Sequence, residues 1–537
     1  MSALINLEVC NAAQARDVTA AKGCPMQPLV ALILASAAAF DGYPHVCDGV
    51  PCGPGHETCG APHAPAAVIH LQDPTCDMND PNAPFVDDRG AHHVFFQKRI
   101  CRSTGGAEQG PVWGHAVSKD LARWSFLPVA IWNGPEAWSA KAIYTGSATR
   151  TDDGVVVVYA GRGFPNAFGA AVPDDTFTNY KKRDDPLIEK TDDDPSTAWR
   201  YEGTWRMIAK GGKMPGCDRC DRDGAPVYAT AGADFLSTWT LEGTSNLPLG
   251  ECPSLFPNPG AQAGDPTHVH FYGKGQAFYH LGDWDDATLT WTTTTGRPVV
   301  ACKGAAGEDP TECRRLDRGA GYYAPKDYDV GGRRIVWAWL SGVAHGCLTL
   351  PRELAYDREL GILTSNPVAE LRSLRLETVA RADGASLYEK PLALDWPRAD
   401  AVEILVRWGG HSRKLQKGAE LALSFGAGGS LSLKCDASGC ATSLFKTGDA
   451  FAWRADDATL SLQIFVDPVA AEVFAQGGRV ATSAPRGGRL RARGPDGQPA
   501  AVPTSLRLAA TAVDGEFAES ATATVRVFSL ASIYEPA

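Results

Sequence analysis

The stretch His268-Val-His-Phe-Tyr-Gly-Lys-Gly-Gln-Ala-Phe-Tyr-His-Leu281 contains two short runs of β-branched and aromatic residues around a glycine-containing turn. Such runs between turn residues are typical of β-strands. Comparable runs recur between Asp-Gly, Gly-Gly and proline-rich segments, and long amphipathic helical patterns are scarce. Many short strands over roughly 300 residues favour a β-propeller or a β-sandwich. The further runs are Val155–Ala160, Trp205–Ala209, Leu289–Thr295 and Arg334–Leu340.

A second β-rich region begins after Leu371-Arg-Ser-Leu-Arg375. A stretch rich in Gly, Arg and Pro, residues 485–499, predicts a surface loop inside it. The sequence therefore predicts an all-β chain with two large domains, residues 67–380 and 385–537, after an N-terminal extension (1–39) and a cysteine-rich segment (40–66). The strands expected in the second domain are Leu431–Cys435, Leu460–Val466, Ala471–Ala475, Ser505–Ala509 and Thr522–Leu530.

The charge of the chain argues against nucleic acid as its partner. The net charge is −11 and no Lys/Arg-rich tract is present, whereas nucleic-acid binding needs a concentrated positive surface. Carbohydrate is a natural alternative because it is neutral and stacks on aromatic rings, and the chain contains 14 Trp.

The N-terminal extension contains the short apolar stretch Met26–Ala39, which ends in small residues. A membrane-spanning helix needs about 20 apolar residues, so this stretch predicts a signal peptide cleaved after Ala37-x-Ala39. We therefore expect translation to start at Met26 and the mature chain to begin near Phe40. The chain would then be secreted or delivered to a vacuolar or lysosomal lumen, with no membrane attachment after cleavage.

The cysteines agree with an oxidising compartment. The chain has 15 Cys, and closely spaced cysteines in a secreted protein predict disulfides that staple loops. Cys217-Asp-Arg-Cys220 could instead indicate zinc or redox chemistry, but it lacks a second half at zinc-finger spacing. The other close groups are Cys47/Cys52/Cys59/Cys76, Cys302/Cys313 and Cys435/Cys440.

A series of acidic and aromatic motifs follows in a fixed order along the chain. The motifs are Asp77-Met-Asn-Asp-Pro-Asn-Ala83, Phe95-Phe-Gln97, Trp113–Leu121, Tyr144–Thr149, Asp193-Asp-Pro195, Trp205-Arg-Met-Ile208, Glu251-Cys-Pro253, Asp317–Ala324, Leu348–Leu354, Ile464–Asp467 and Glu472–Phe474. In this order they resemble glycoside hydrolase family 32, the invertases and fructan hydrolases, over about residues 68–533. This resemblance implies a five-bladed β-propeller followed by a C-terminal β-sandwich.

The resemblance implies that Asp80 is a catalytic nucleophile, Glu251 the acid/base and Asp194 a third carboxylate that stabilises the transition state. Glycosidic bond cleavage with retention needs two carboxyl groups about 5–5.5 Å apart. Distant positions in the sequence can meet because the blades of a propeller converge on its centre. Glu251 precedes the apolar pair Leu255-Phe256, so we expect a partly desolvated carboxyl with a raised pKa, as a general acid requires.

The chain departs from the family pattern at three positions. Asp193 replaces the arginine of an Arg-Asp-Pro motif, which leaves two adjacent acids, and Arg200 or Arg206 is a candidate to compensate. Asp77 replaces a tryptophan, which removes an expected wall of the sugar site, and Ala83 replaces a glycine.

The residues expected to contact the sugar come from the same motifs. For the aromatic members the alternative interpretation is core packing. The expected contacts are Asn79, Gln97, Trp113, Tyr144, Thr145 and Asp193.

Three function classes remain open at this point. The first is a retaining β-fructofuranosidase acting on sucrose or fructan, the second a fructosyltransferase with the same covalent intermediate, and the third an inactive fructan-binding propeller. The sequence contains no Walker loop, His-Glu-x-x-His pair or Gly-x-Ser-x-Gly elbow. The expected chemistry requires no metal and no cofactor, and the expected partner is a sucrose or fructan oligosaccharide.

Overall fold

The computed structural model describes four ranges of the chain, residues 56–58, 67–103, 111–302 and 313–534, apart from internal gaps. The gaps are residues 75, 100, 192, 212–223, 298, 300, 320, 389, 410–417, 426–429, 443–449, 487–501 and 513–520. The expected signal peptide and the cysteines before Cys76 lie outside the described residues.

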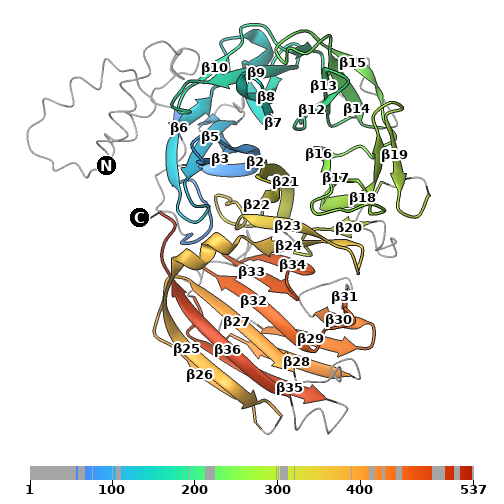
Figure 1. Ribbon diagram of the computed structural model, residues 1–537. Helices are drawn as coiled ribbons and strands as arrows, with labels where there is room; N and C mark the ends of the chain where they lie inside the picture. Colours follow the sequence, from blue (N-terminus) through green and yellow to red (C-terminus); the bar gives the residue numbers. More distant parts are fainter. Residues whose placement is uncertain are drawn as a thin grey trace, which may run out of the picture.

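Five antiparallel sheets form a ring in the N-terminal part of the chain (Figure 1). The inner strand of the last sheet contacts that of the first, which closes the ring. Blade 1 consists of β2 (Asp77–Val86), β3 (His92–Arg99), β5 (Val112–Ser118) and β6 (Ser125–Ile131). Blade 2 consists of β7 (Ala142–Thr151), β8 (Gly154–Arg162), β9 (Ala167–Pro173), β10 (Tyr180–Lys182) and β11 (Ile188–Glu189).

Blades 3, 4 and 5 continue the ring in chain order. Blade 3 is β12 (Trp199–Tyr201), β13 (Thr204–Ile208), β14 (Pro226–Thr230) and β15 (Trp239–Thr244). Blade 4 is β16 (Glu251–Pro257), β17 (His268–Gly273), β18 (Ala277–Asp285), β19 (Thr290–Thr293) and β20 (Arg314–Arg315). Blade 5 is β21 (Tyr322–Val330), β22 (Arg333–Leu340), β23 (Arg352–Asp357) and β24 (Ile362–Pro367).

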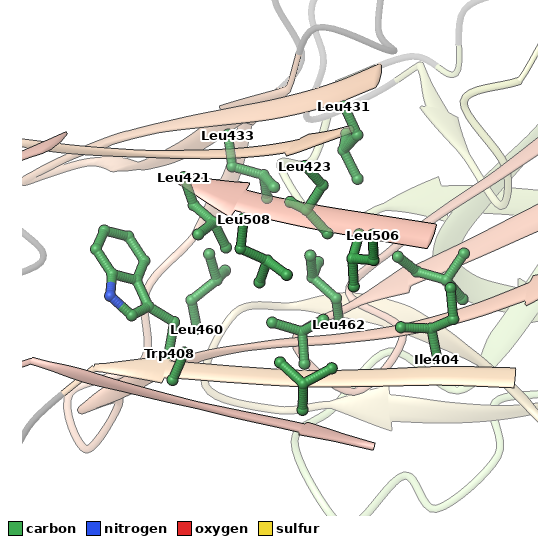
Figure 2. Packing of buried hydrophobic residues seen from close by; sticks show 14 of the residues in the cluster. Ile404, Trp408, Leu421, Leu423, Leu431, Leu433, Leu460, Leu462, Leu506 and Leu508 are labelled. Carbon is green, nitrogen blue, oxygen red and sulfur yellow. The ribbon is translucent and has the colours of Figure 1, made fainter. Parts of the chain in front are cut away.

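The C-terminal part consists of two six-stranded sheets that face each other. Their strands alternate buried and exposed positions, so one face of each sheet forms a common core of leucines, isoleucine and Trp408 (Figure 2). One sheet contains β25 (Arg375–Ser386), β27 (Val402–Gly409), β32 (Thr459–Val466), β33 (Ala470–Ala475), β34 (Val480–Pro485) and β36 (Thr522–Leu530). The other contains β26 (Leu392–Asp395), β28 (Ala419–Ser424), β29 (Ser430–Asp436), β30 (Gly439–Thr442), β31 (Ala450–Ala452) and β35 (Ser505–Ala512).

The expected fold class, a five-bladed β-propeller followed by a β-sandwich, is confirmed. β25 runs across residues 380–385, where the sequence divides the two domains. The described helical segments are the short 3-10 helices η2 (Ala137–Ser139) and η3 (Ala369–Leu374), and β1 (His56–Thr58) pairs with β4 (Cys101–Ser103).

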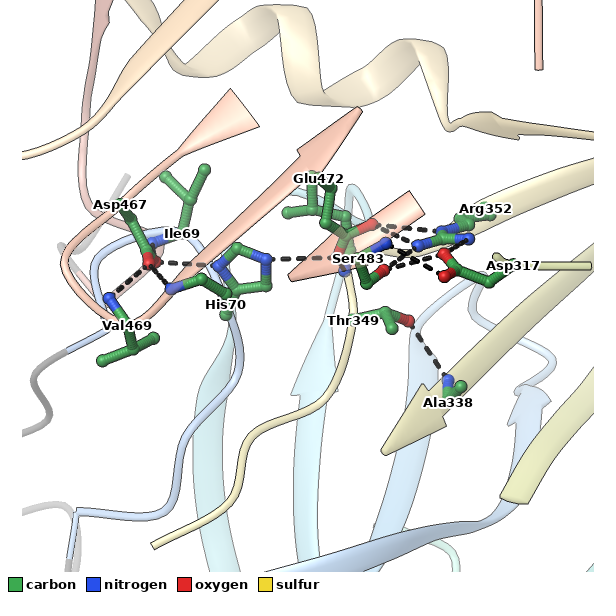
Figure 3. A network of polar contacts seen from close by, with 12 residues as sticks. Ile69, His70, Asp317, Ala338, Thr349, Arg352, Asp467, Val469, Glu472 and Ser483 are labelled. Carbon is green, nitrogen blue, oxygen red and sulfur yellow. Dashed lines mark hydrogen bonds and ion pairs between the residues drawn. The ribbon is translucent and has the colours of Figure 1, made fainter. Parts of the chain in front are cut away.

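A buried polar network joins the two domains (Figure 3). His70 lies between Asp467 and Glu472, at 2.8 and 3.1 Å, and Arg352 contacts Glu472 at 2.6 Å and Asp317 at 2.8 Å. All these side chains are fully buried, so each charge depends on its partners, and the contacts of His70 and Arg352 with Asp467 and Glu472 cross the interface.

Two of the expected disulfides are confirmed, Cys302–Cys313 and Cys435–Cys440. Cys76 is also disulfide-bonded, whereas Cys252 and Cys347 are buried free thiols. Within the described part of the chain, no helix has the length and apolar character to cross a membrane.

Candidate active site

Four of the five inner strands change pairing register near their N-terminal ends. An extra residue in one strand re-aims the side chain beside it, and such bulges are common next to active sites. The breaks fall between Met78 and Pro81, between Tyr144 and Gly146, between Glu251 and Ser254, and between Tyr323 and Lys326.

Asp80 lies at the break in β2 and is held by polar side chains from two blades. Thr145 Oγ1 donates a hydrogen bond to Asp80 Oδ2 at 2.9 Å, and Gln97 Nε2 donates to the same oxygen at 3.1 Å. Gln97 Nε2 also donates to Thr145 Oγ1 at 2.9 Å. Burial, followed by the charge of Asp194, raises the pKa of Asp80 to about 7.

Asp194 lies in the segment that leads into β12, and Cys252 lies beside it in β16. Both have a left-handed backbone, with φ of 57° and 52°, a conformation that is strained in residues other than glycine and is common at functional sites. Cys252 N donates to Asp194 Oδ2 at 3.0 Å. Cys252 Sγ lies 3.9 Å from Asp80 Oδ2 and 4.0 Å from Asp194 Oδ2, so both carboxylates lie close to one sulfur atom.

Glu251 begins β16, directly before Cys252, and both of its oxygens accept hydrogen bonds. Lys210 Nζ lies 2.6 Å from Glu251 Oε1, and Tyr323 OH donates to Oε2 at 2.6 Å. Burial alone would raise the pKa of Glu251, but the bonds from Lys210 and Tyr323 hold it below its ordinary value. The expected raised pKa is therefore wrong for this structure, because Lys210, which lies in none of the motifs, brings a cation to this carboxyl.

Asp193 is buried and forms an ion pair with Arg162, which lies at the end of β8. The two candidates suggested by the sequence contact other acids: Arg200 pairs with Asp152, and Arg206 pairs with Glu242 and Asp286. The expectation that either arginine compensates Asp193 is therefore wrong. Burial and the neighbouring Asp194 raise the pKa of Asp193 to about 7 despite Arg162.

The remaining expected residues lie around this centre at different depths. Trp113 has no exposed surface, and its Nε1 donates to the Tyr144 carbonyl at 2.9 Å, so it packs behind the site, as the core-packing alternative describes. Tyr144 is half-buried beneath the Arg162 guanidinium, 5.5 Å from its ring centre. Asn79 is half-buried next to Asp80.

Asp77, which replaces the tryptophan of the family pattern, contacts blade 5. His345 Nδ1 lies 2.7 Å from Asp77 Oδ1, so this position forms a polar contact between two blades.

Several residues of the site were not among those singled out from the sequence. Tyr323 lies within a quoted motif, Asp317–Ala324, and could have been selected from it. Lys210 and Arg162 lie in no motif, and their partners depend on how the blades meet. Lys326 is buried and its Nζ lies 3.1 Å from Ser147 Oγ. Among the residues that the structure describes, no three His, Cys, Asp or Glu side chains are arranged to hold a metal ion.

The fold and the cluster of carboxylates at the inner strands define the class of β-propeller glycosidases. Residues 70–367 match the profile of the glycosyl hydrolases family 32 N-terminal domain, and the chain belongs to this family. The resemblance inferred from the motifs is confirmed.

Curated relatives and solved structures agree with this assignment. The chain is 29% identical over 360 residues to an insoluble β-fructofuranosidase isoenzyme of Arabidopsis thaliana, covering 58% of this chain and 57% of the relative. It is 29% identical over 431 residues to a cell-wall β-fructofuranosidase of Zea mays, covering 67% and 66%. The chain thus spans somewhat more than half of these relatives' length. Fructan 1-exohydrolase IIa from Cichorium intybus, solved with 1-kestose, has the same fold, with a TM-score of 0.65, 20% identity and coverage of 88% and 99%.

Proposed function

We propose that this protein is a retaining β-fructofuranosidase that releases terminal β-D-fructofuranosyl units from sucrose or fructans. The observation that carries the proposal is the convergence of Asp80, Asp194 and Glu251 around Cys252 at the inner ends of three blades. Two neighbouring carboxyl groups are the chemical requirement for double displacement. The names of the relatives, β-fructofuranosidases and a fructan exohydrolase, support fructosides as the substrate class.

In the proposed mechanism Asp80 attacks the anomeric carbon of the fructosyl unit and forms a covalent ester. Glu251 gives its proton to the departing oxygen, then takes a proton from the water that cleaves the ester. Asp194 accepts hydrogen bonds from sugar hydroxyls and stabilises the positive charge that develops on the ring. The proposed sugar contacts are Gln97 and Thr145, which bind Asp80, and the residues next to Thr145 and Asp80 in the chain, Tyr144 and Asn79.

In the state that reacts, Asp80 and Glu251 together carry one proton, and this proton must lie on Glu251. In the free protein Asp80 has the higher pKa of the two, so the proton favours Asp80 and the productive arrangement is the minor one. The two carboxyls then titrate as a pair. Glu251 governs the acid limb of kcat/KM and Asp80 the basic limb.

The roles of the two carboxyls are tested with Asp80→Asn and Glu251→Gln on an activated fructoside. A good leaving group needs little protonation, so Glu251→Gln should form the covalent intermediate and accumulate it, and azide should restore turnover. Asp80→Asn should form no intermediate and should not respond to azide. Asp153→Asn and Glu202→Gln, which change exposed acids elsewhere on the propeller, serve as matched controls. Azide rescue of Asp80→Asn, or near-normal activity of both variants, would contradict the assignment.

Product analysis separates the proposed hydrolase from the other two classes. Incubation with sucrose and with inulin should release free fructose. Longer oligosaccharides would instead indicate a fructosyltransferase, and retained binding without turnover would indicate a binding module.

We also propose that the protein works in a secreted or vacuolar compartment. The disulfides Cys302–Cys313 and Cys435–Cys440 support an oxidising environment. Mass spectrometry of the native protein should find an N-terminus near Phe40, whereas an intact Met1 with free thiols would contradict this proposal.

A further inference from the structure

Lys210 follows β13 and lies opposite Asp193 in a short antiparallel bridge. Lys210 N donates to Asp193 O at 2.8 Å. Side chains directly opposite in an antiparallel pair start about 4.5–5.5 Å apart. The Cβ atoms of Lys210 and Asp193 are therefore close together. At position 193 the family pattern carries arginine, whereas this chain carries aspartate.

The two opposed side chains connect to different neighbours. Asp193 pairs with Arg162 of blade 2, whereas Lys210 reaches Glu251 of blade 4. The Lys210 and Glu251 side chains are 29% and 44% exposed, so the pair remains open to solvent and substrate.

Of the described cations near the site, Lys210 is the one that contacts Glu251. Arg162 is engaged by Asp193, and Lys326 lies against Ser147. Tyr323 OH binds the second oxygen of Glu251. The titratable and charged groups that face Glu251 are Lys210 after β13, Tyr323 of β21, Asp193 and Asp194 before β12, Asp80 of β2, and Cys252 of its own strand.

We propose that Lys210 is a positioning residue for Glu251, which orients its carboxyl and favours its ionised form, so that it supplies the cation that position 193 lacks. The inference rests on the proposed function only for the acid/base role of Glu251. The ionised form is the one that activates water in the second half-reaction, so Lys210 favours that step.

The direct test is a pH titration of the Glu251 carboxyl by carbon-13 NMR, with the signal assigned through Glu251→Gln. A nearby cation lowers a carboxyl pKa by about 1–3 units. Lys210→Met should therefore raise the pKa of Glu251 by about one unit or more. Lys210→Gln, which removes the charge but keeps a polar side chain, should do the same, and Lys210→Arg should restore the original value. Lys119→Met removes an exposed cation that follows β5 on blade 1 and should change nothing.

Kinetics on sucrose give the second readout. Because Glu251 governs the acid limb of kcat/KM, that limb should move to higher pH in Lys210→Met and return in Lys210→Arg. An unchanged Glu251 titration in Lys210→Met and Lys210→Gln would overturn the inference even if the wild-type protein hydrolyses sucrose. A wild-type protein without turnover would contradict the proposed function, and the NMR titration would still decide the role of Lys210.

Discussion

At the scale of single residues, the site depends on how Asp80 is held. Its Oδ2 accepts from both Thr145 and Gln97, and Thr145 in turn accepts from Gln97. Hydrogen bonds to a carboxylate favour its ionised form, and the Thr145 bond lowers the pKa of Asp80 against the larger effect of burial. The hydroxyl at position 145 therefore tunes the acidity of Asp80, the proposed nucleophile.

We predict that Thr145→Val moves the basic limb of kcat/KM to higher pH and lowers its maximum. Loss of the bond raises the pKa of Asp80, and a hydrogen bond to a charged group is worth about 1.5–3 kcal/mol, or about one to two pKa units. The proton then stays on Asp80 more often, so the maximum should fall by about ten- to a hundredfold. Thr145→Ser keeps the hydroxyl and should behave like wild type. If Val and Ser gave the same pH profile, the hydroxyl would have no such role.

The sequence predicted the carboxylates of the site better than their surroundings. Asp80, Asp194 and Glu251 lie in motifs and are brought together in the structure. Arg162 and Lys210 lie outside the motifs, and which acid each one contacts depends on the spacing between blades, which local sequence does not determine. The expected compensation by Arg200 or Arg206 was wrong because both lie in strands whose side chains meet other acids.

At the scale of elements, the breaks in the inner strands position the site. Gly146 lies directly after Thr145 at the break in β7. A Cβ at Gly146 would lie 2.0 Å from the Val158 carbonyl oxygen and 2.8 Å from Tyr159 Cα. The absence of a side chain therefore lets β7 approach β8 closely enough to aim Thr145 at Asp80.

We predict that Gly146→Ala destabilises the propeller and lowers activity together. The clash is with backbone atoms, so β7 must shift, and overpacking of this kind costs about 1–3 kcal/mol. Chemical denaturation should show the loss of stability, and kcat should fall because Thr145 moves with the strand. Gly232→Ala, where a Cβ meets nothing within 4 Å, is the matched control. Equal stabilities of the two variants would show that the close approach is not required.

The strands themselves were largely predictable. The run Thr522–Leu530 coincides with β36, and Leu460–Val466 lies within β32. β25 was not predicted, because every one of its positions is exposed or half-buried and it lacks the apolar alternation of a half-buried strand. The number of blades came from the resemblance, since strand patterns do not determine how many sheets close a ring.

At the scale of the whole molecule, the network around His70 couples the propeller to the sandwich. His70 comes from the segment before blade 1, and its partners Asp467 and Glu472 come from the sandwich. Burial alone would lower the pKa of His70, but the two carboxylates raise it to about 10, and the pKa of Asp467 falls to about 2. The interface therefore contains a histidine that stays protonated when the unfolded chain would lose that proton.

We predict that the free energy of unfolding declines from about pH 6.5 toward pH 9 and that His70→Gln removes this part of the decline. Below its ordinary pKa of 6.5, the histidine is protonated in both the folded and the unfolded protein, so it contributes fully to the free energy of unfolding. As the pH rises toward about 10, this contribution is lost. One retained proton corresponds to about 1.4 kcal/mol per pH unit. Asp467 acts in the opposite range, because its contribution is lost as pH falls from 3.8 toward about 2.

Denaturant unfolding of wild type and His70→Gln at several pH values between 6.5 and 9 tests this prediction. The difference in stability between them should shrink as pH rises. Burial raises the pKa of Cys347 and of the tyrosines around the network, so these groups reduce stability only above their ordinary pKa values, about 8.5 for a thiol and about 10 for a tyrosine. Their contribution is the same in wild type and His70→Gln, so it cancels in the difference between the two. Buried histidines with lowered pKa values, such as His93, change stability below pH 6.5 instead.

His268→Gln, at a half-buried position on blade 4, is the control and should keep the wild-type slope. A constant difference between wild type and His70→Gln across this range would mean that folding does not raise the pKa of His70 and would contradict the prediction.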